Sequence, residues 1–299
     1  MIKVTRVSKS FGRVVALDAV SLAIGEGERV AFVGANGSGK TTLLRALLGL
    51  VRFEGTITVA GDDVARAPEI ALRSVAYVPQ IAPPLEAPVA EVVRACASLR
   101  GGTEGEIYER AGRLGLDVGA CRGKRFRDLS GGTKQKLLAA MALAAATPVL
   151  VCDEPTANLD GEARASFFEQ LAERPTSSVI VLCSHRVDEV RWTVSRVVEM
   201  VDGRVASDGP PADLYPDAPT FRVEVTLREG TGDADSALRA SGFARSGSGR
   251  LVAVAVRERA VALATRLMKD HGAALTDLTI APIGAVPASE RRPRPGAAS

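Results

Sequence analysis

The sequence predicts an α/β protein with a mostly parallel sheet, followed by a second and smaller α/β domain. Through the first 210 residues, apolar strand-like runs alternate with segments of helical apolar spacing. A glycine-rich loop joins a strand-like run at 29–33 to a helix-like run at 43–48. After proline-containing turns that end near residue 219, a new pattern of strands and helices begins. These three observations give the fold class.

The individual elements follow from the same periodicities. Apolar runs separated by glycine turns predict early strands at 2–7, 15–24, 29–33 and 56–60. Helical spacing predicts an inserted helical segment with helices at 89–99, 105–114 and 134–145. Alternation then returns, with strands at 149–152, 178–183 and 196–200 and a helix at 162–173. The small domain is predicted to hold strands at 221–227, 251–256 and 275–280 and helices at 233–240 and 258–269.

Composition narrows the class of protein. Apolar residues make up 46% of the chain and charged residues 24%, which is typical of a soluble globular protein. A net charge of +3 is too small to indicate a nucleic-acid partner, and none is expected. The apolar runs end well short of the roughly 18 residues that a membrane span needs. The amino terminus lacks the apolar core of a signal peptide, so we expect a cytoplasmic protein.

The four cysteines do not indicate a metal site or a disulfide framework. They are widely separated along the chain, and no two have the spacing of metal ligands. Cys152 and Cys183 fall inside apolar strand-like runs, where cysteine acts as a small hydrophobic side chain.

The glycine-rich loop predicts a nucleoside triphosphate site. Residues 34–42 fit the pattern G-x-x-x-x-G-K-[ST] between a strand and a helix. Glycines let successive backbone N–H groups point at one phosphate chain, next to the positive end of the helix dipole. Lys40 is expected to reach the β- and γ-phosphates, and the Thr41 hydroxyl to bind Mg²⁺. The candidate binding residues are Gly34, Asn36, Gly37, Ser38, Gly39, Lys40, Thr41 and Thr42.

A second helix start has the features of an anion site. In the run Leu129-Ser130-Gly131-Gly132-Thr133-Lys134-Gln135, a hydroxyl and two glycines precede a helix. Two such termini in one molecule suggest that two phosphate-binding surfaces meet across an interface. The alternative is that Ser130 is an ordinary helix cap with no further role.

Two carboxylates follow the buried strand at 149–152. Ligands of open α/β sheets bind at the carboxyl ends of strands, where Asp153 and Glu154 lie. Asp153 suits a Mg²⁺ contact through water, because Mg²⁺ keeps much of its hydration shell. Glu154 is then placed to polarise the attacking water. The alternative is a pair of carboxylates that caps the following turn.

Two further polar residues end strand-like runs. His185 follows the strand at 178–183, where its imidazole is expected to contact the γ-phosphate or the attacking water. Gln80 ends another run, and its amide can reach Mg²⁺ and the same water. A lone histidine is more often structural, and Gln80 by itself would indicate nothing.

In this order, the motifs resemble the ATPase subunit of ATP-binding-cassette (ABC) transporters over about residues 1–210. The resemblance matches 34–42 to the Walker A loop, Gln80 to the Q-loop, 129–135 to the signature motif and 149–153 to Walker B. It makes Glu154 the catalytic glutamate, 158–160 the D-loop and His185 the switch histidine. Phe11 falls where the family stacks an aromatic ring on adenine. Thr133, Cys152 and Phe11 depart from the commonest residues, yet none of them removes a phosphate or metal contact.

The resemblance implies a fold, cofactors and partners. The fold is an ABC-type P-loop NTPase with a mixed sheet core and a helical signature subdomain. The cofactors are ATP and Mg²⁺, with Thr41, Gln80 and Asp153 on the metal. Two copies are expected to pair head to tail as a homodimer, bound to integral membrane permease subunits on the cytoplasmic face of the inner membrane. The residues that close on the partner's ATP are Ser130, Gly131 and Gly132, with Asp160 crossing the same seam.

The sequence also bears on the direction of transport and on other functions that such an ATPase could have. The small carboxyl-terminal domain favours an exporter over an importer. A soluble ABC ATPase without a membrane partner is the main alternative, although such proteins usually carry two cassettes in one chain. A regulator that does not hydrolyse ATP would be expected to lack Glu154 or His185, and both are present.

We predict three segments. The nucleotide-binding domain spans 1–210, with its helical subdomain at about 85–147. A small α/β accessory domain spans 220–281, and a proline- and arginine-rich tail at 282–299 is expected to be disordered. No constellation of residues in the accessory domain carries chemistry. A dimer-supporting or regulatory role is the expectation for it.

Overall fold

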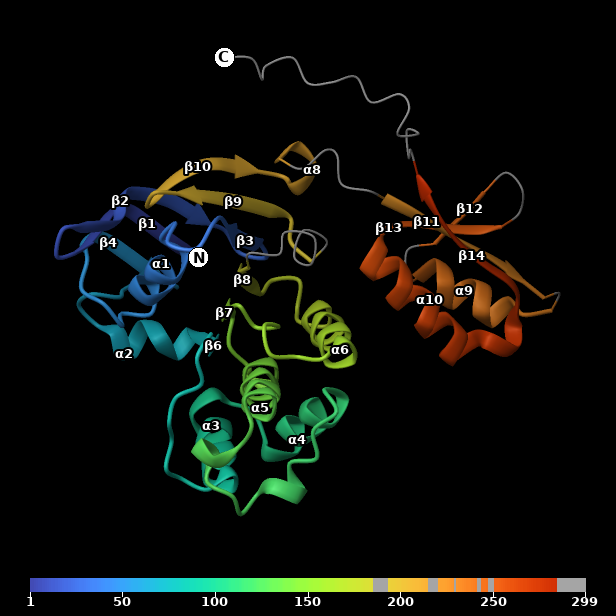
Figure 1. Ribbon diagram of the computed structural model, residues 1–299, viewed down its shortest axis with the longest axis horizontal. Helices are drawn as coiled ribbons and strands as arrows, with labels where there is room; N and C mark the ends of the chain where they lie inside the picture. The colour runs from blue at the N-terminus through green and yellow to red at the C-terminus, as the bar shows by residue number, and fades with distance from the viewer. Residues whose placement is uncertain (185–192, 215–219, 229, 241–242, 247–249, 284–299) are drawn as a thin grey trace, which may run out of the picture. The chain divides into compact units, whose positions relative to one another are not determined.

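The computed structural model describes residues 1–184, 193–214, 220–228, 230–240, 243–246 and 250–283 (Figure 1). It divides into two compact units, Met1–Leu214 and Tyr215–Ser299. Each unit has its own apolar core. The predicted disordered tail lies, from residue 284 onward, outside the described residues.

A six-stranded sheet organises the first unit. Its order is β10 (Arg204–Gly209), β9 (Arg196–Val201), β3 (Arg29–Val33), β8 (Val179–Cys183), β7 (Val149–Asp153) and β6 (Val75–Val78). All pairs are parallel except β9 with β10. The residues of β7 and β8 are all buried, which explains why these strands form unbroken apolar runs.

A second sheet of the first unit is antiparallel. Its order is β2 (Val14–Ile24), β1 (Ile2–Phe11), β4 (Glu54–Val59) and β5 (Asp62–Asp63). The early strands other than β3 therefore do not join the parallel sheet, and the expectation of one mostly parallel sheet was incomplete. The physical reason is the tight turn between β1 and β2, since a two-residue connection can join only antiparallel strands. Gly12 in that turn has a φ of 59°.

The main core packs around helix α1 (Lys40–Leu47). Its buried leucines, Leu43, Leu44 and Leu47, join one apolar cluster with residues of both sheets, including Phe32 and Ile57. The helix begins directly at the lysine of the phosphate-binding loop. Burial of this helix therefore fixes the loop against the sheet.

A helical insertion separates β6 from β7. It contains α3 (Val89–Arg100), α4 (Glu104–Arg113) and α5 (Gly131–Ala144). Thr103 and Glu106 form a reciprocal capping box at the start of α4. Helix α5 begins three residues before the predicted start at 134, because the Ser130 hydroxyl caps it and accepts from Thr133 N. After β7, Asp160 caps the start of helix α6 (Gly161–Ala172).

The second unit has the order β11 (Thr220–Leu227), α9 (Gly232–Ala240), β12 (Ala244–Arg245), β13 (Leu251–Val256), α10 (Arg257–His271) and β14 (Leu275–Ile283). The sheet order is β12-β13-β11-β14, all antiparallel. This is the βαββαβ arrangement called ferredoxin-like. Residues of both helices pack with Val223 and Val225 of β11 in one cluster. Strand β14 runs to Ile283, two residues into the segment expected to be disordered.

Short elements join the larger ones. They are α2 (Pro68–Ala71) and α8 (Pro211–Leu214), and the sequence patterns did not predict them. Helices of one turn carry too few residues for a periodicity to be recognised. Among the described residues, no helix is both long and apolar enough to cross a bilayer.

Candidate functional site

The phosphate-binding loop leaves the carboxyl end of β3 and curls tightly before α1. Gly39 has a φ of 103°, and a Cβ at this position would lie 2.5 Å from the Ala16 carbonyl oxygen. Gly34 has a φ of 145°, and its missing Cβ would collide with the carbonyl oxygen of Met200. Only glycine meets both demands, a left-handed backbone and a close neighbour. The loop tip at Asn36 and Gly37 is exposed, while Ser38 is buried.

Lys40 lies inside its own loop. Its Nζ donates to the carbonyl oxygens of Gly34 at 2.7 Å and Ala35 at 3.0 Å, and to Ser38 Oγ at 3.5 Å. All three acceptors are neutral, and among the described residues Lys40 forms no ion pair. A buried ammonium without a direct ion pair is costly, and a phosphate chain bound in the loop can supply the opposite charge.

Asp153 ends β7 beside the loop. The Thr41 hydroxyl donates to its Oδ1 at 3.3 Å, while Oδ2 is buried and has no hydrogen-bond partner among the described residues. Burial raises the pKa of this carboxyl, an effect that the Thr41 hydrogen bond partly offsets. An orphaned carboxylate oxygen next to a threonine hydroxyl matches the oxygen ligands that Mg²⁺ prefers. The residues present therefore fit the metal.

Glu154 follows in a strained backbone conformation. Its φ is 48°, in the left-handed region that non-glycine residues avoid. Its N–H donates to the Cys183 carbonyl at 3.0 Å, and the residue is buried at 9% exposure. Strain of this kind persists where the surroundings over-determine it and is common at functional sites.

The strand register brings the polar strand ends to one edge of the sheet. Val78 of β6 pairs with Cys152 of β7, and Asp153 pairs with Cys183 of β8. Gln80, which is exposed, lies two residues beyond the end of β6 at this edge. His185 falls outside the described residues. The last described residue before it, Ser184, is bonded through its N–H to the Phe32 carbonyl.

Phe11 and the signature segment lie on the surface of the first unit. The Phe11 ring is half-exposed, with the Lys9 ammonium 4.9 Å from its centroid. Ser130 and Gly131 are exposed at the start of α5, where Ser130 Oγ accepts from Thr133 N and the N–H groups before Thr133 have no partner within the helix. Asp160 caps α6 by accepting from Ala163 N at 2.8 Å. The structure therefore brings Lys40, Thr41, Asp153 and Glu154 together, and it shows no contact between Ser130 and the loop of the same chain.

Contacts of α5 with the segment after Glu154 could not be found from the sequence. Lys136 Nζ lies 2.8 Å from Asp160 Oδ2, and Gln135 Nε2 donates to the Pro155 carbonyl at 3.1 Å. The paired residues are 24 and 20 positions apart, so no local pattern pairs them. They connect the signature helix to the strand end that carries the two carboxylates.

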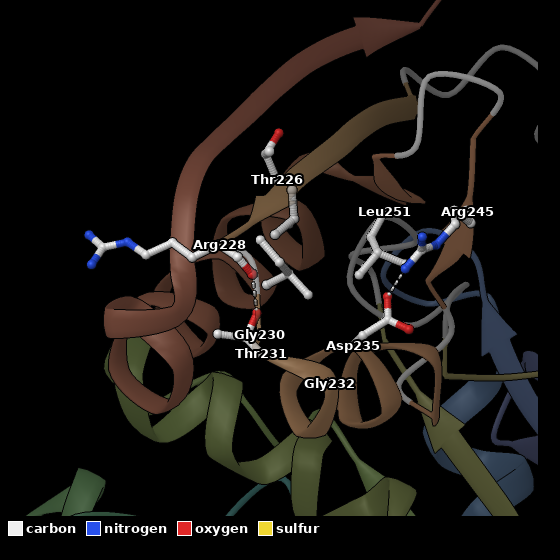
Figure 2. Close-up of a pocket in the computed structure, with 10 residues that line it drawn as sticks. Thr226, Arg228, Gly230, Thr231, Gly232, Asp235, Arg245 and Leu251 are labelled. Carbon is white, nitrogen blue, oxygen red and sulfur yellow. Dashed lines mark hydrogen bonds and ion pairs between the residues drawn. The ribbon is translucent and has the colours of Figure 1, made fainter.

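The second unit holds a cavity of about 310 Å³ beside the start of α9 (Figure 2). Its two best-placed charges already bond to each other, since Arg245 lies 2.8 Å from Asp235. Arg239 also pairs with Asp235 at 3.0 Å, and these hydrogen bonds hold the pKa of that carboxyl below its usual value. Two of the charged side chains that line the cavity, Asp235 and Arg245, are therefore already paired with each other, and Arg228 is a third.

Comparison with known proteins identifies the family. The sequence pattern of the family described as "ABC transporter" matches residues 17–157. A cobalamin import ATP-binding protein of Halobacterium salinarum is 38% identical over 74% of the chain, which spans 58% of that relative's length. A putative ABC transporter ATP-binding protein of the same species is 36% identical over 73% of the chain and 98% of its own length.

Solved structures agree with this similarity. A bacterial ABC transporter cassette, solved as a dimer, is 25% identical and superposes with a TM-score of 0.62. The match covers 71% of this chain and 99% of that cassette. The predicted fold class, an ABC-type P-loop NTPase with an added carboxyl-terminal domain, is confirmed. The chain belongs to the ATP-binding subunits of ABC transporters.

Proposed function

We propose that this chain binds and hydrolyses Mg²⁺-ATP and drives transport by separate membrane subunits. The single observation that carries the proposal is the pairing of Thr41 with Asp153. It places a hydroxyl and a buried, partly unsatisfied carboxylate next to the lysine of the phosphate-binding loop. This set of donors suits a nucleoside triphosphate and its metal.

Each residue has a distinct chemical task in this proposal. Loop N–H groups and Lys40 hold the β- and γ-phosphates, and Phe11 stacks on the adenine. Thr41, Asp153 and Gln80 hold Mg²⁺, directly or through water. The metal, when bound, supplies positive charge that offsets charge developing on the phosphate oxygens.

The water that attacks the γ-phosphate is oriented by carboxylate and imidazole. Glu154 accepts its proton, and His185 contacts the γ-phosphate or the same water. The strained backbone at Glu154 supports this role, because it turns the residue away from the course of β7 at the sheet edge.

The active unit in this proposal is a homodimer with two shared sites. Ser130, Gly131 and Gly132 of one copy close on the ATP bound at Lys40 of the other, and Asp160 crosses the same seam. The exposure of the α5 tip and its lack of contact with its own loop support this arrangement. The dimeric form of the solved relative also supports it.

Membrane permease subunits complete the proposed transporter, which places the chain on the cytoplasmic face of the inner membrane. The expectation of export gains no support from the cobalamin relative, which is named for import. The proposal therefore specifies ATP-driven transport and leaves the export direction out. A soluble ABC ATPase acting without membrane subunits is the competing function.

Mg²⁺-dependent phosphate release by the purified chain tests the proposal. Lys40→Ala should weaken nucleotide binding, and Glu154→Gln should trap an ATP-bound dimer with turnover reduced at least about 100-fold. Ser130→Arg should abolish hydrolysis while the single subunit still binds ATP. Unchanged turnover in Glu154→Gln would contradict the assignment of the base. Failure of a tagged chain to co-purify with any polytopic membrane protein would favour the soluble alternative.

A further inference from the structure

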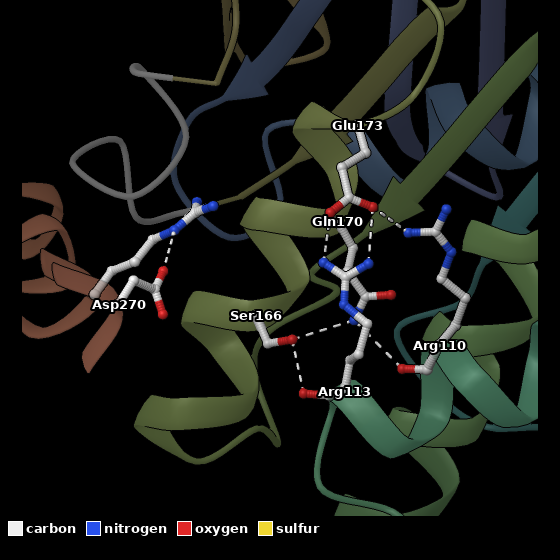
Figure 3. Close-up of polar contacts among 7 residues, drawn as sticks. Arg110, Arg113, Ser166, Gln170, Glu173 and Asp270 are labelled. Carbon is white, nitrogen blue, oxygen red and sulfur yellow. Dashed lines mark hydrogen bonds and ion pairs between the residues drawn. The ribbon is translucent and has the colours of Figure 1, made fainter. Parts of the chain in front are cut away.

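A polar cluster outside the nucleotide site holds α4 against α6 (Figure 3). The Glu173 carboxylate accepts two hydrogen bonds from Arg113, one of 2.8 Å from Nη1 to Oε2 and one of 2.5 Å from Nη2 to Oε1. Arg110 Nη1 adds a third, 2.5 Å from Oε2. A two-point guanidinium–carboxylate contact fixes direction as well as distance.

Two further side chains of α6 bond to the last turn of α4. Ser166 Oγ donates to the Arg113 carbonyl at 2.7 Å, and Gln170 Nε2 donates to the Arg110 carbonyl at 3.3 Å. Gln170 is fully buried. The Arg113 carbonyl, at the end of α4, needs a partner from outside the helix, which Ser166 supplies, whereas the Arg110 carbonyl also accepts from Leu114 N at 3.2 Å. This end of α4 is therefore docked through both its backbone and its side chains.

The opposite end of α6 also contacts the helical insertion. Asp160, the cap of α6, pairs with Lys136 of α5, six residues beyond Ser130. The insertion is joined to the sheet by two chain crossings, after β6 and before β7. Contacts at both ends of α6 restrain rotation of the insertion about those crossings.

Glu173 itself lies at the edge of the sheet opposite the phosphate-binding loop. Arg29, the first residue of β3, donates through Nη2 to the Ala172 and Arg174 carbonyls, both at 3.4 Å. The loop follows the last residue of β3, about 16 Å further along the strand. Glu173 is therefore too distant to touch a nucleotide bound at Lys40.

We propose that Glu173 is a positioning residue, which acts through its contacts with Arg110 and Arg113. It sets the orientation of Ser130, Gly131 and Gly132 at the start of α5, which we call the signature tip. The inference rests on the proposed function, in which the tip of one copy must meet the nucleotide of the other. A tip held at a fixed angle needs less ordering when the two copies close. Removal of the Glu173 charge weakens its contacts with Arg110 and Arg113, and the hydrogen bonds of Ser166 and Gln170 then hold this end of α4 less firmly.

A comparison of one variant at the end of α6 with one inside the helix tests this role. Both Glu173→Gln and Glu169→Gln are made in the Glu154→Gln background, and dimer formation with ATP is measured by analytical ultracentrifugation. Glu169 is exposed, one turn before Glu173, and is the matched control. We expect the dimer dissociation constant to rise about tenfold for Glu173→Gln and to stay unchanged for Glu169→Gln. ATP affinity of the dilute single subunit should stay within about twofold in both.

Other outcomes are equally decisive. An unchanged dimer constant in Glu173→Gln would overturn the inference. So would a parallel loss of dimerisation, single-subunit ATP affinity and thermal stability, because that pattern reports a structural role alone. If Glu173→Gln does not fold, Arg113→Lys keeps the charge but loses the two-point contact, and about a threefold rise is expected. Failure of Glu154→Gln itself to dimerise with ATP would instead overturn the proposed function, and this inference with it.

Discussion

At the scale of single residues, the site depends on groups that are costly to bury. Asp153 has a carboxylate oxygen without a hydrogen-bond partner among the described residues, and Glu154 has a left-handed backbone. Lys40 holds its charge among neutral oxygens. A phosphate chain can neutralise Lys40 and a metal can satisfy the Asp153 oxygen, whereas the backbone strain at Glu154 remains whether or not ligand is bound. These residues therefore lower the stability of the fold, which is expected of residues that serve ligand binding.

The raised pKa of Asp153 predicts a pH dependence. A carboxyl with a raised pKa holds its proton more tightly in the folded state than in the unfolded one. Stability without metal should therefore fall as pH rises through the window between those two pKa values. Mg²⁺ binding, which needs the carboxylate, should weaken on acidification at a higher pH than for an ordinary aspartate.

The variant Asp153→Asn tests the predicted direction of this pH dependence. The variant should lose Mg²⁺-dependent ATP binding and its pH dependence, and gain about 1 kcal/mol of unfolding free energy at pH 8 without metal. Titration calorimetry and urea unfolding at pH 5 and pH 8 measure both effects. A variant less stable than the parent at pH 8 would contradict the assigned cause of the shift.

Two glycines of the phosphate-binding loop, Gly37 and Gly39, separate the cost of a left-handed backbone from the cost of a close contact. Gly39→Ala forces a Cβ against the Ala16 carbonyl in a left-handed conformation, while Gly37, with a φ of 86°, has no atom within 4 Å of its missing Cβ. We expect Gly39→Ala to cost about 3 kcal/mol and Gly37→Ala about 1 kcal/mol, measured by thermal unfolding. Equal losses would show that the close contact has no effect.

At the scale of elements, α5 and α6 connect the signature segment to the sheet. The contacts of Glu173 and Asp160 have been described above. In addition, the buried Arg174, just after α6, donates to two carbonyls at and after the end of α5. Its Nη1 lies 3.1 Å from Ala145 O, and its Nη2 lies 2.5 Å from Thr147 O. Burial lowers the pKa of this guanidinium. The carboxyl end of α5, where the helix dipole is negative, is thus held by a cation.

Arg174→Met should therefore destabilise the first unit more than loss of a surface arginine. The variant leaves buried carbonyls without donors, which we expect to cost about 3 kcal/mol in urea unfolding. Arg94→Met is the control, because Arg94 is exposed and pairs with Glu104 on the surface, a contact worth at most about 1 kcal/mol. Similar losses in the two variants would argue against the capping role of Arg174.

At the scale of the whole molecule, two separate cores indicate that the second unit of a chain is not needed to form its nucleotide-binding surfaces. All described site residues lie in Met1–Leu214, and the second unit has its own cluster around Val223 and Val225. Its ferredoxin-like arrangement buries one face of the sheet under two helices. The domain boundary near residue 214 is our proposal for where the chain can be divided.

Truncation after Leu214 should therefore leave ATP binding intact. We expect the affinity of the shortened chain for Mg²⁺-ATP to stay within about twofold of the full chain. Fluorescence titration with a labelled nucleotide measures this. A loss of more than about tenfold would show that the second unit supports the site.

Local sequence patterns predicted the phosphate-binding loop and most helices and strands. The features that they missed have physical causes. The loop at 34–42 and the strand end at 149–154 could be found because phosphate and metal chemistry need particular residues in sequence. The antiparallel sheet was missed because alternation predicts a strand and not its partner. The start of α5 was missed because glycines weaken helical propensity, while the cap at Ser130 outweighs them.

The sequence by itself determined the phosphate-binding loop, the strand-end carboxylates and the family, because these depend on residues adjacent in the chain. The tertiary structure decided which distant groups meet. It brought Thr41 to Asp153, Lys136 to Asp160, and Arg110 and Arg113 to Glu173. Such pairs join residues from different elements, so they depend on how helices pack on the sheet. Packing is a property of the whole fold, and no local pattern encodes it.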